Sequence, residues 1–137
     1  MPGEGFFSVD SLRGVWVLLI DPDAGGRRAL ADVLGYCGAL VTAVGTPDEA
    51  FRIMRQVKPD VLVVDLAISQ PEPFAFIRQV RSLKPEDGGV VPAIAIGAGD
   101  GAPPEDVVRG RGYDGHLRKP LDPWTLCGMV SRVTSGR

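Results

Sequence analysis

The feature that most constrains the fold of this chain is a series of short, continuous apolar runs. Three of them, Val15–Ile20, Val61–Val64 and Val90–Ile96, are too short for helices and do not alternate with polar residues. Runs of this kind are typical of strands that are covered on both faces of a parallel sheet. Two weaker segments, Leu40–Val44 and Gly115–Arg118, predict two further strands. The pattern therefore indicates five strands in a parallel sheet.

Segments with helical periodicity separate these runs. Thr46–Glu49 reads as a capping box with proline at the first helical position, and Asp122–Pro123 repeats the cap followed by proline. Pro104–Arg109 lies in a glycine-rich stretch and is expected to form only a short or irregular helix. Four apolar stripes recur at spacings of three and four residues: Leu30, Val33, Leu34 and Cys37; Ala50, Ile53, Met54 and Val57; Phe76, Ile77, Val80 and Leu83; Leu126, Met129, Val130 and Val133.

Strands that alternate with helices predict an α/β fold, an open and doubly wound parallel sheet with helices on both faces. We expect one domain over residues 15–134, with an N-terminal tail at residues 1–14 and a C-terminal tail at residues 135–137. Phe6 and Phe7 could dock on the body of the domain. Trp16, inside the first strand, is expected in the core.

Composition and charge exclude several classes of function. The chain has 137 residues, 45% of them hydrophobic, and a formal net charge of −2. It has no basic surface of the kind that binds nucleic acid directly, and no apolar run approaches the length of a membrane span. The first fourteen residues do not read as a secretion signal. Cys37 and Cys127 fall in helical patterns, which predicts buried thiols in a reducing compartment. We therefore expect a cytoplasmic domain.

Charged residues follow several of the predicted strands. Asp21 comes directly after the first strand, Asp65 after the third and Lys119 after the fifth. Ligands of an open parallel sheet bind at the carboxyl ends of its strands, so we expect these side chains to converge. Two nearby carboxylates favour a cation such as Mg²⁺, and a lysine facing them suits a phosphoryl group. Asp23 and Asp100 also follow strands, where an acid can instead cap the next helix.

Three segments in this order, Val17–Asp21, Pro59–Leu66 and Leu117–Pro120, resemble the receiver domain of two-component response regulators. The resemblance covers about residues 15 to 134. It implies a flavodoxin-like receiver fold with strand order 2-1-3-4-5. It also implies a cis peptide bond between Lys119 and Pro120.

The resemblance further implies roles for individual residues. Asp65 would accept a phosphoryl group from a histidine kinase or a phosphotransfer protein, and Lys119 would pair with that group. Asp21, Asp65 and the carbonyl group of Ala67 would hold Mg²⁺. The protein would then be a magnesium-dependent phosphoprotein of phosphorelay signal transduction.

The sequence departs from the receiver pattern at several positions. Pro22 stands where receivers usually have a second acid, which weakens the expected Mg²⁺ site. Gly97 replaces the usual serine or threonine, and His116 replaces the switch aromatic. Ser69–Pro73 replaces the usual Pro-Gly loop. Losing one donor to a developing oxyanion costs roughly 10²–10³ in rate, so Gly97 alone need not abolish phosphorylation. We therefore expect an atypical or degenerate receiver.

The leading prediction for the function is a stand-alone receiver domain of a two-component phosphorelay. It would act by binding a partner protein and would not be an enzyme beyond phosphoryl transfer to Asp65. Gly97, His116 and Trp124 are the expected switch and partner surface. Trp124 lies off the last apolar stripe and is expected on the side shared by the fourth and fifth helices. A downstream protein or a second copy would bind this face, formed by the fourth helix, fifth strand and fifth helix.

Two other functions stay open at this stage. The first is a pseudo-receiver, an interaction module that works without phosphorylation. The second is a phosphatase of the haloacid-dehalogenase type, with Asp21 as nucleophile and Asp23 as general acid; against it, Gly25 replaces the usual threonine or valine. A nucleotide-binding loop at Gly97–Gly101 is weaker, because it lacks the third glycine of the fingerprint.

Overall fold

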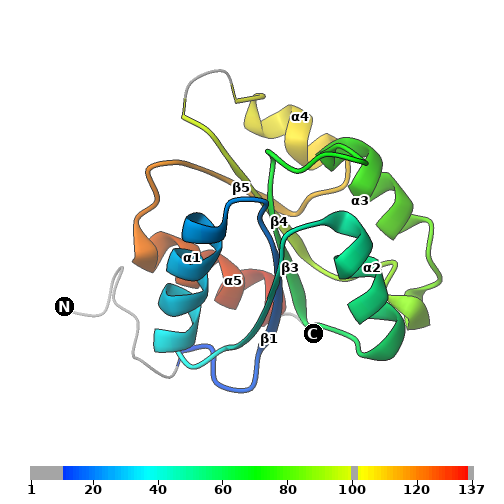
Figure 1. The fold of residues 1–137 in the computed structure, drawn as a ribbon. Coiled ribbons are helices and arrows are strands. Elements are labelled where there is room, and N and C mark those ends of the chain that lie inside the picture. The colour runs from blue at the N-terminus through cyan, green and yellow to red at the C-terminus, as the bar shows by residue number, and fades with distance from the viewer. Residues whose placement is uncertain (1–10, 100–101, 136–137) are drawn as a thin grey trace.

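The computed structural model describes residues 11–99 and 102–135, and its five strands form one parallel sheet (Figure 1). The order across the sheet is β2-β1-β3-β4-β5, and each neighbouring pair is parallel. The doubly wound α/β fold predicted from the sequence pattern and the strand order that the resemblance implied are thus confirmed. The strands are β1 (Trp16–Ile20), β2 (Leu40–Val44), β3 (Val61–Asp65), β4 (Ala93–Gly97) and β5 (Gly115–Arg118).

Helices cover both faces of the sheet, and each face has its own core. Helices α1 and α5 pack on one face, and α2, α3 and α4 pack on the other (Figure 1). None of the helices within the described residues is long and apolar enough to cross a membrane. The helices are α1 (Ala24–Tyr36), α2 (Pro47–Gln56), α3 (Pro73–Arg81), α4 (Glu105–Gly110) and α5 (Pro123–Thr134), with a short 3-10 helix at Pro85–Asp87.

The helix starts follow the local chemistry of the sequence. Thr46 caps α2, because its hydroxyl accepts a hydrogen bond from the Glu49 backbone N–H at 3.2 Å. The Glu49 carboxylate in turn accepts from the Gly45 N–H at 3.1 Å, one residue before the N-cap N–H that a capping box uses. Asp122 caps α5 ahead of Pro123. Both predicted starts are confirmed, and α4 is short as expected.

The predicted fourth strand began too early in the chain. The expectation was Val90–Ile96, whereas β4 begins at Ala93. Val90 is 71% exposed, and the Val91 N–H donates to the Gly88 carbonyl in a turn that follows the 3-10 helix. Pro92 has no N–H to offer to a ladder. An apolar run was therefore read as a strand where its first half forms a turn.

Two expectations near the N-terminus were also wrong. Residues 11–14 are not a free tail, because Leu12 is fully buried and its N–H donates to the Cys37 carbonyl at 2.8 Å. Trp16 is only partly buried, and its ring N–H donates to the Thr42 hydroxyl at 2.9 Å. Phe6 and Phe7 lie outside the described residues. Cys37 and Cys127 are free, buried thiols, as predicted.

Candidate functional site

The carboxyl edge of the sheet brings three charged side chains together. Asp65 is the last residue of β3, and Asp21 directly follows the adjacent β1. Lys119 directly follows β5, and its N–H donates to the carbonyl of Gly97, the last residue of β4, at 2.9 Å. Parallel strands end at a common edge, so residues far apart in sequence become neighbours. The peptide bond between Lys119 and Pro120 is cis, as the resemblance implied.

Asp65 is buried, and both of its carboxylate oxygens are hydrogen bonded. Oδ2 accepts from Lys119 Nζ at 2.7 Å, and Oδ1 accepts from the Ala67 N–H at 2.8 Å. The Lys119 side chain is 46% exposed, whereas that of Asp65 is 4% exposed. The hydrogen bond to Asp65 raises the pKa of Lys119, and the charges of Asp65, Asp21 and Asp23 add to the effect. Lys119 is therefore a stable ammonium that reaches from solvent to the carboxylate.

Asp21 is also buried, but only one of its oxygens has a partner. Oδ1 accepts from the Asp23 N–H at 2.9 Å, whereas no described residue donates to the buried Oδ2. A Cβ atom built on Gly26 would lie 2.9 Å from Oδ2, so the glycine leaves that oxygen uncrowded. Burial raises the pKa of Asp21 against the lowering effect of the Asp23 N–H, and the nearby charges of Asp65 and Asp23 raise it further.

This donor set fits a sparsely ligated Mg²⁺. Within the described residues, no three histidine, cysteine, aspartate or glutamate side chains form a metal-binding group. Mg²⁺ commonly binds through one or two carboxylates and keeps several waters, so three are not required. The unpartnered Oδ2 of Asp21 beside the Asp65 carboxylate is the chemistry that such an ion would satisfy. Pro22, which is exposed, contributes no carboxylate.

Asp23 has a structural role at this edge. Its carboxylate accepts from the Gly26 N–H at 2.7 Å and so caps α1. Arg27, in the first turn of α1, donates to the Asp21 carbonyl at 2.8 Å and ties the helix start to the site. Asp23 is therefore engaged as a helix cap, which was one of the two readings of this acid. Asp100 lies outside the described residues.

A cavity of about 250 Å³ opens beside Asp65 and Lys119. The cavity borders the charged edge, and apolar groups and backbone form the rest of its wall. They belong to Leu66, Ala67, Gly97, Ala98, Ala102 and Pro103.

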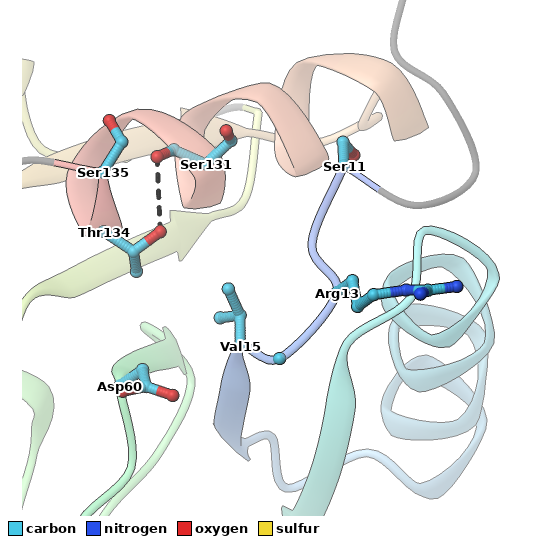
Figure 2. A pocket seen from close by; sticks show the side chains of 8 residues that line it. Ser11, Arg13, Val15, Asp60, Ser131, Thr134 and Ser135 are labelled. Atoms are coloured by element: carbon cyan, nitrogen blue, oxygen red, sulfur yellow. Dashed lines mark hydrogen bonds between the residues drawn. The ribbon is translucent and has the colours of Figure 1, made fainter.

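A larger cavity of about 460 Å³ lies at the other end of the strands, near the start of β1 and the end of α5 (Figure 2). Hydroxyl groups of α5 line one side of it, and Arg13, Val15 and Asp60 line the other. The Asp60 carboxylate accepts from the Trp16 backbone N–H at 2.8 Å, which holds the entry of β1. The bond between Thr134 and the Ser131 carbonyl belongs to the helix end. Size alone therefore does not locate the site.

Trp124 lies on a different side of α5 from the one expected. Its ring packs edge-on against Tyr36 of α1, with 6.5 Å between the ring centroids, and not toward α4. The reason is helical periodicity: Trp124 precedes Cys127 by three residues, and the Cys127 thiol points to the Val33 carbonyl of α1 at 3.9 Å. Trp124 is therefore not part of the α4-facing surface.

One contact at the site joins two positions at which the sequence departs from the receiver pattern. His116 is 7% exposed on β5, and its Nε2 lies 3.1 Å from the position that a Cβ on Gly97 would occupy. The two departures from the receiver pattern are thus in contact. The sequence alone carries no signal for this contact, because it depends on the register of β4 with β5, which sets His116 opposite Ala95, on the same face as Gly97.

Comparisons with known proteins agree with this fold. No family model matches the sequence. The chain is 31% identical over 116 residues to an uncharacterized 14.6 kDa protein in the sodA1 3' region of Leptolyngbya boryana, covering 85% of this chain and 87% of that protein. It is 32% identical over 104 residues to the probable transcriptional regulatory protein y4xI of Sinorhizobium fredii. That match covers 76% of this chain but only 43% of the regulator.

Solved structures show the same architecture. A putative response regulator from Chloroflexus aurantiacus superposes with a TM-score of 0.82 at 21% identity, covering 88% of this chain and 98% of the other. The receiver domain of a histidine kinase from Syntrophus aciditrophicus superposes with a TM-score of 0.78 at 24% identity, covering 90% of this chain and 92% of the other. The fold is thus the CheY-like class. The solved structures that share this fold are response regulators and receiver domains, and one sequence relative is named a probable transcriptional regulatory protein.

Proposed function

We propose that Asp65 is a phosphoacceptor and that its phosphorylation tunes the binding of a partner protein. The observation that supports this is the 2.7 Å contact between Asp65 Oδ2 and Lys119 Nζ, beside the buried Asp21. Phosphoryl transfer to a carboxylate needs an attacking oxygen and positive charge to receive the phosphoryl oxygens. Asp65 and Lys119 supply these two groups at one edge of the cavity.

The proposed reaction is an exchange between two phosphorylated groups. A carboxylate oxygen of Asp65 attacks the phosphorus of a phosphohistidine on a histidine kinase or a phosphotransfer protein. A P–O bond forms, giving an acyl phosphate, and the P–N bond to the donor imidazole breaks. The released imidazole nitrogen takes up a proton from water. Lys119 moves its hydrogen bond from the carboxylate to a phosphoryl oxygen, which is within reach because its side chain is partly exposed beside the cavity.

Magnesium belongs to this proposal. Asp21, Asp65 and the carbonyl of Ala67 are the groups that would hold the ion. When bound, it would neutralise part of the negative charge on the phosphoryl oxygens. Because Pro22 supplies no second acid, we expect weaker Mg²⁺ binding than a site with three carboxylates would give. A receiver served by a histidine kinase works in the cytoplasm, and its phosphorylated form would bind a downstream protein or a second copy through α4, β5 and α5.

A second candidate function is a pseudo-receiver that binds its partner without phosphorylation. Pro22 and Gly97 favour it, because neither position offers the oxygen ligand or donor found in other receivers. The third candidate, a phosphatase with Asp23 as general acid, is disfavoured by the role of that carboxylate as the cap of α1.

Intact-mass measurement after incubation with acetyl phosphate and Mg²⁺ tests the proposal. We expect the mass to rise by one phosphoryl group in the native protein and no rise in Asp65→Asn. Asp23→Asn is the matched control, because asparagine also caps helices and the variant should still be labelled. If the mass does not rise under conditions that label another receiver domain, the proposal is wrong and the pseudo-receiver function is favoured. Hydrolysis of a phosphomonoester that is lost in Asp21→Asn but kept in Asp65→Asn would favour the phosphatase.

A further inference from the structure

The single histidine of the chain is buried with an unused hydrogen-bonding atom. His116 lies in β5 and is 7% exposed, and no described residue forms a hydrogen bond with its Nε2. Buried polar groups are normally paired, so an unpaired one calls for an explanation. A position that served packing alone would suit an apolar ring better than an imidazole. The surroundings of Nε2 show what the nitrogen could meet.

Nε2 is buried behind the wall of the cavity that Asp65 and Lys119 line, and His116 is not itself a lining residue. A Cβ atom on Gly97 would lie 3.1 Å from Nε2, 3.2 Å from Leu66 Cδ1 and 3.3 Å from Ala102 Cβ. Gly97, Leu66 and Ala102 all line that cavity. The imidazole thus reaches the space that a side chain at position 97 would fill. Glycine at 97 leaves room for the ring, and a larger residue there would press on it.

We propose that His116 Nε2 donates a hydrogen bond to the phosphoryl group on Asp65, in the place of a hydroxyl side chain at position 97. This inference rests on the proposed phosphorylation of Asp65. It explains Gly97 and His116 together. Position 97 has no side chain to donate a hydrogen bond, and His116 on the neighbouring strand β5 supplies the donor instead. His116 is then a phosphoryl-binding residue.

The charges around the ring are compatible with this role. Burial lowers the pKa of His116, the nearby Arg118 lowers it further, and Glu105 of α4 opposes both. The unphosphorylated protein therefore holds a neutral ring at neutral pH, which carries one N–H. A phosphoryl group on Asp65 would bring negative charge into the cavity that Gly97 lines. That charge favours a proton on Nε2 and strengthens the bond.

Because His116 is the only histidine, its imidazole can be observed without assignment. We would label the protein with ¹⁵N-histidine and record the imidazole nitrogens against pH, before and after adding Mg²⁺ with acetyl phosphate or beryllofluoride. We expect the Nε2 resonance to move and the proton affinity of the ring to rise, roughly ten- to a thousandfold. Asp65→Asn should abolish both changes.

The outcomes separate this inference from the proposed function. If intact mass shows a phosphoryl group but the imidazole signals and titration stay unchanged, the donor role of His116 is wrong and phosphorylation stands. If neither acetyl phosphate nor beryllofluoride reacts, the proposed function fails and the inference fails with it.

Variants give a second, independent readout in the rate of phosphorylation by acetyl phosphate. His116→Phe fills the space without a donor and should slow the reaction about 10²-fold, the lower end of what one oxyanion donor contributes. His116→Gln keeps an amide donor and should retain more of the rate. The double variant Gly97→Ser with His116→Ala returns a hydroxyl to position 97 and should recover rate lost in His116→Ala. Circular dichroism verifies that each variant folds, and equal rates in the Phe and Gln variants would overturn the inference.

Discussion

The two buried carboxyl groups of the charged edge have different hydrogen-bond environments. Both oxygens of Asp65 are paired, one with Lys119 and one with the Ala67 N–H. Asp21 has one buried oxygen without a described donor, and burial raises the pKa of this carboxyl group. A bound cation would therefore offset the cost of a buried, unpaired carboxylate oxygen most at Asp21. Single substitutions at Asp21 and His116 should therefore change how stability responds to Mg²⁺ and to pH.

The first concerns Asp21 and Mg²⁺. Without the ion, Asp21→Asn should raise the free energy of unfolding by about 1 kcal/mol, because it removes a buried charge next to Asp65. Mg²⁺ should stabilise the native protein, by about 2.7 kcal/mol at a hundred times its dissociation constant, and should stabilise the variant less. Urea unfolding with MgCl₂, or with NaCl at equal ionic strength, measures both effects. Asp23→Asn should keep the native response, and an equal Mg²⁺ effect in Asp21→Asn would exclude Asp21 as a ligand.

The second concerns His116 and pH. The pKa of His116 in the folded protein lies below the ordinary value of 6.5, so the unfolded chain binds the proton more readily. The contribution of His116 to stability is therefore full above about pH 6.5 and is lost as the pH falls through the folded pKa. We expect the unfolding free energy of the native protein minus that of His116→Phe to be flat above pH 7 and to fall by about 1 kcal/mol toward pH 5. A difference that grows in acid would show that the ring is stabilised as imidazolium.

At the scale of elements, Arg81 connects three segments that the sheet alone does not join. From the end of α3, its guanidinium donates to the carbonyls of Gly112, at 2.9 Å, and Val91, at 2.7 Å. It also donates to the Gly89 carbonyl and contacts Asp114, whose carboxylate accepts from the first N–H of β4. The turns that lead into β4 and β5 are thus fixed to α3 by one side chain.

Removing that side chain should be costly. Arg81→Ala should lower the free energy of unfolding by about 2–4 kcal/mol, because it leaves several partly buried carbonyl groups without donors. Arg81→Lys should recover only part of the lost stability, since a single ammonium group cannot donate to all of the same acceptors at once. Denaturant unfolding measures both variants. The matched control is Arg78→Ala, one turn earlier on the exposed side of α3, and a similar loss there would show that helix propensity explains the effect.

Elements also show where sequence reasoning succeeds and where it fails. The start of α2 could be predicted because the groups that form its cap, the side chains of Thr46 and Glu49 and the Gly45 and Glu49 N–H groups, lie within five consecutive residues. The start of β4 was misplaced because apolar content outweighed the missing N–H of Pro92. The side of α5 that carries Trp124 depends on α1, which lies far away in the sequence. Local chemistry is therefore readable, whereas the partner of a helix face requires the tertiary structure.

At the scale of the whole molecule, the candidate site follows from topology more than from any one segment. Asp21, Asp65 and Lys119 could be named from sequence because each comes at the end of a strand and parallel strands end together. The contact between His116 and Gly97 could not, since it depends on the register of β4 with β5 and on the direction of one ring. The relation between Gly97 and His116, which both depart from the receiver pattern, therefore becomes visible only in the tertiary structure.

Both cores share the central sheet, so the molecule should unfold as one unit. The thiols of Cys37 and Cys127 report on this, because both are buried between α1 and α5. Burial raises the pKa of Cys127 to about 12, with Cys37 adding to the effect. At pH 8 only about one Cys127 thiol in 10⁴ would be the reactive thiolate.

We therefore expect iodoacetamide to modify the thiols only when the whole protein opens. At pH 8 the alkylation rate, followed by intact mass, should rise with urea in proportion to the unfolding equilibrium constant. Arg81→Ala should raise the rate by the factor that its loss of stability predicts, roughly thirtyfold for 2 kcal/mol, although Arg81 packs on the other face of the sheet. Arg78→Ala should leave the rate nearly unchanged. Alkylation independent of urea, or insensitive to Arg81→Ala, would show instead that α1 and α5 separate locally while the rest of the sheet stays folded.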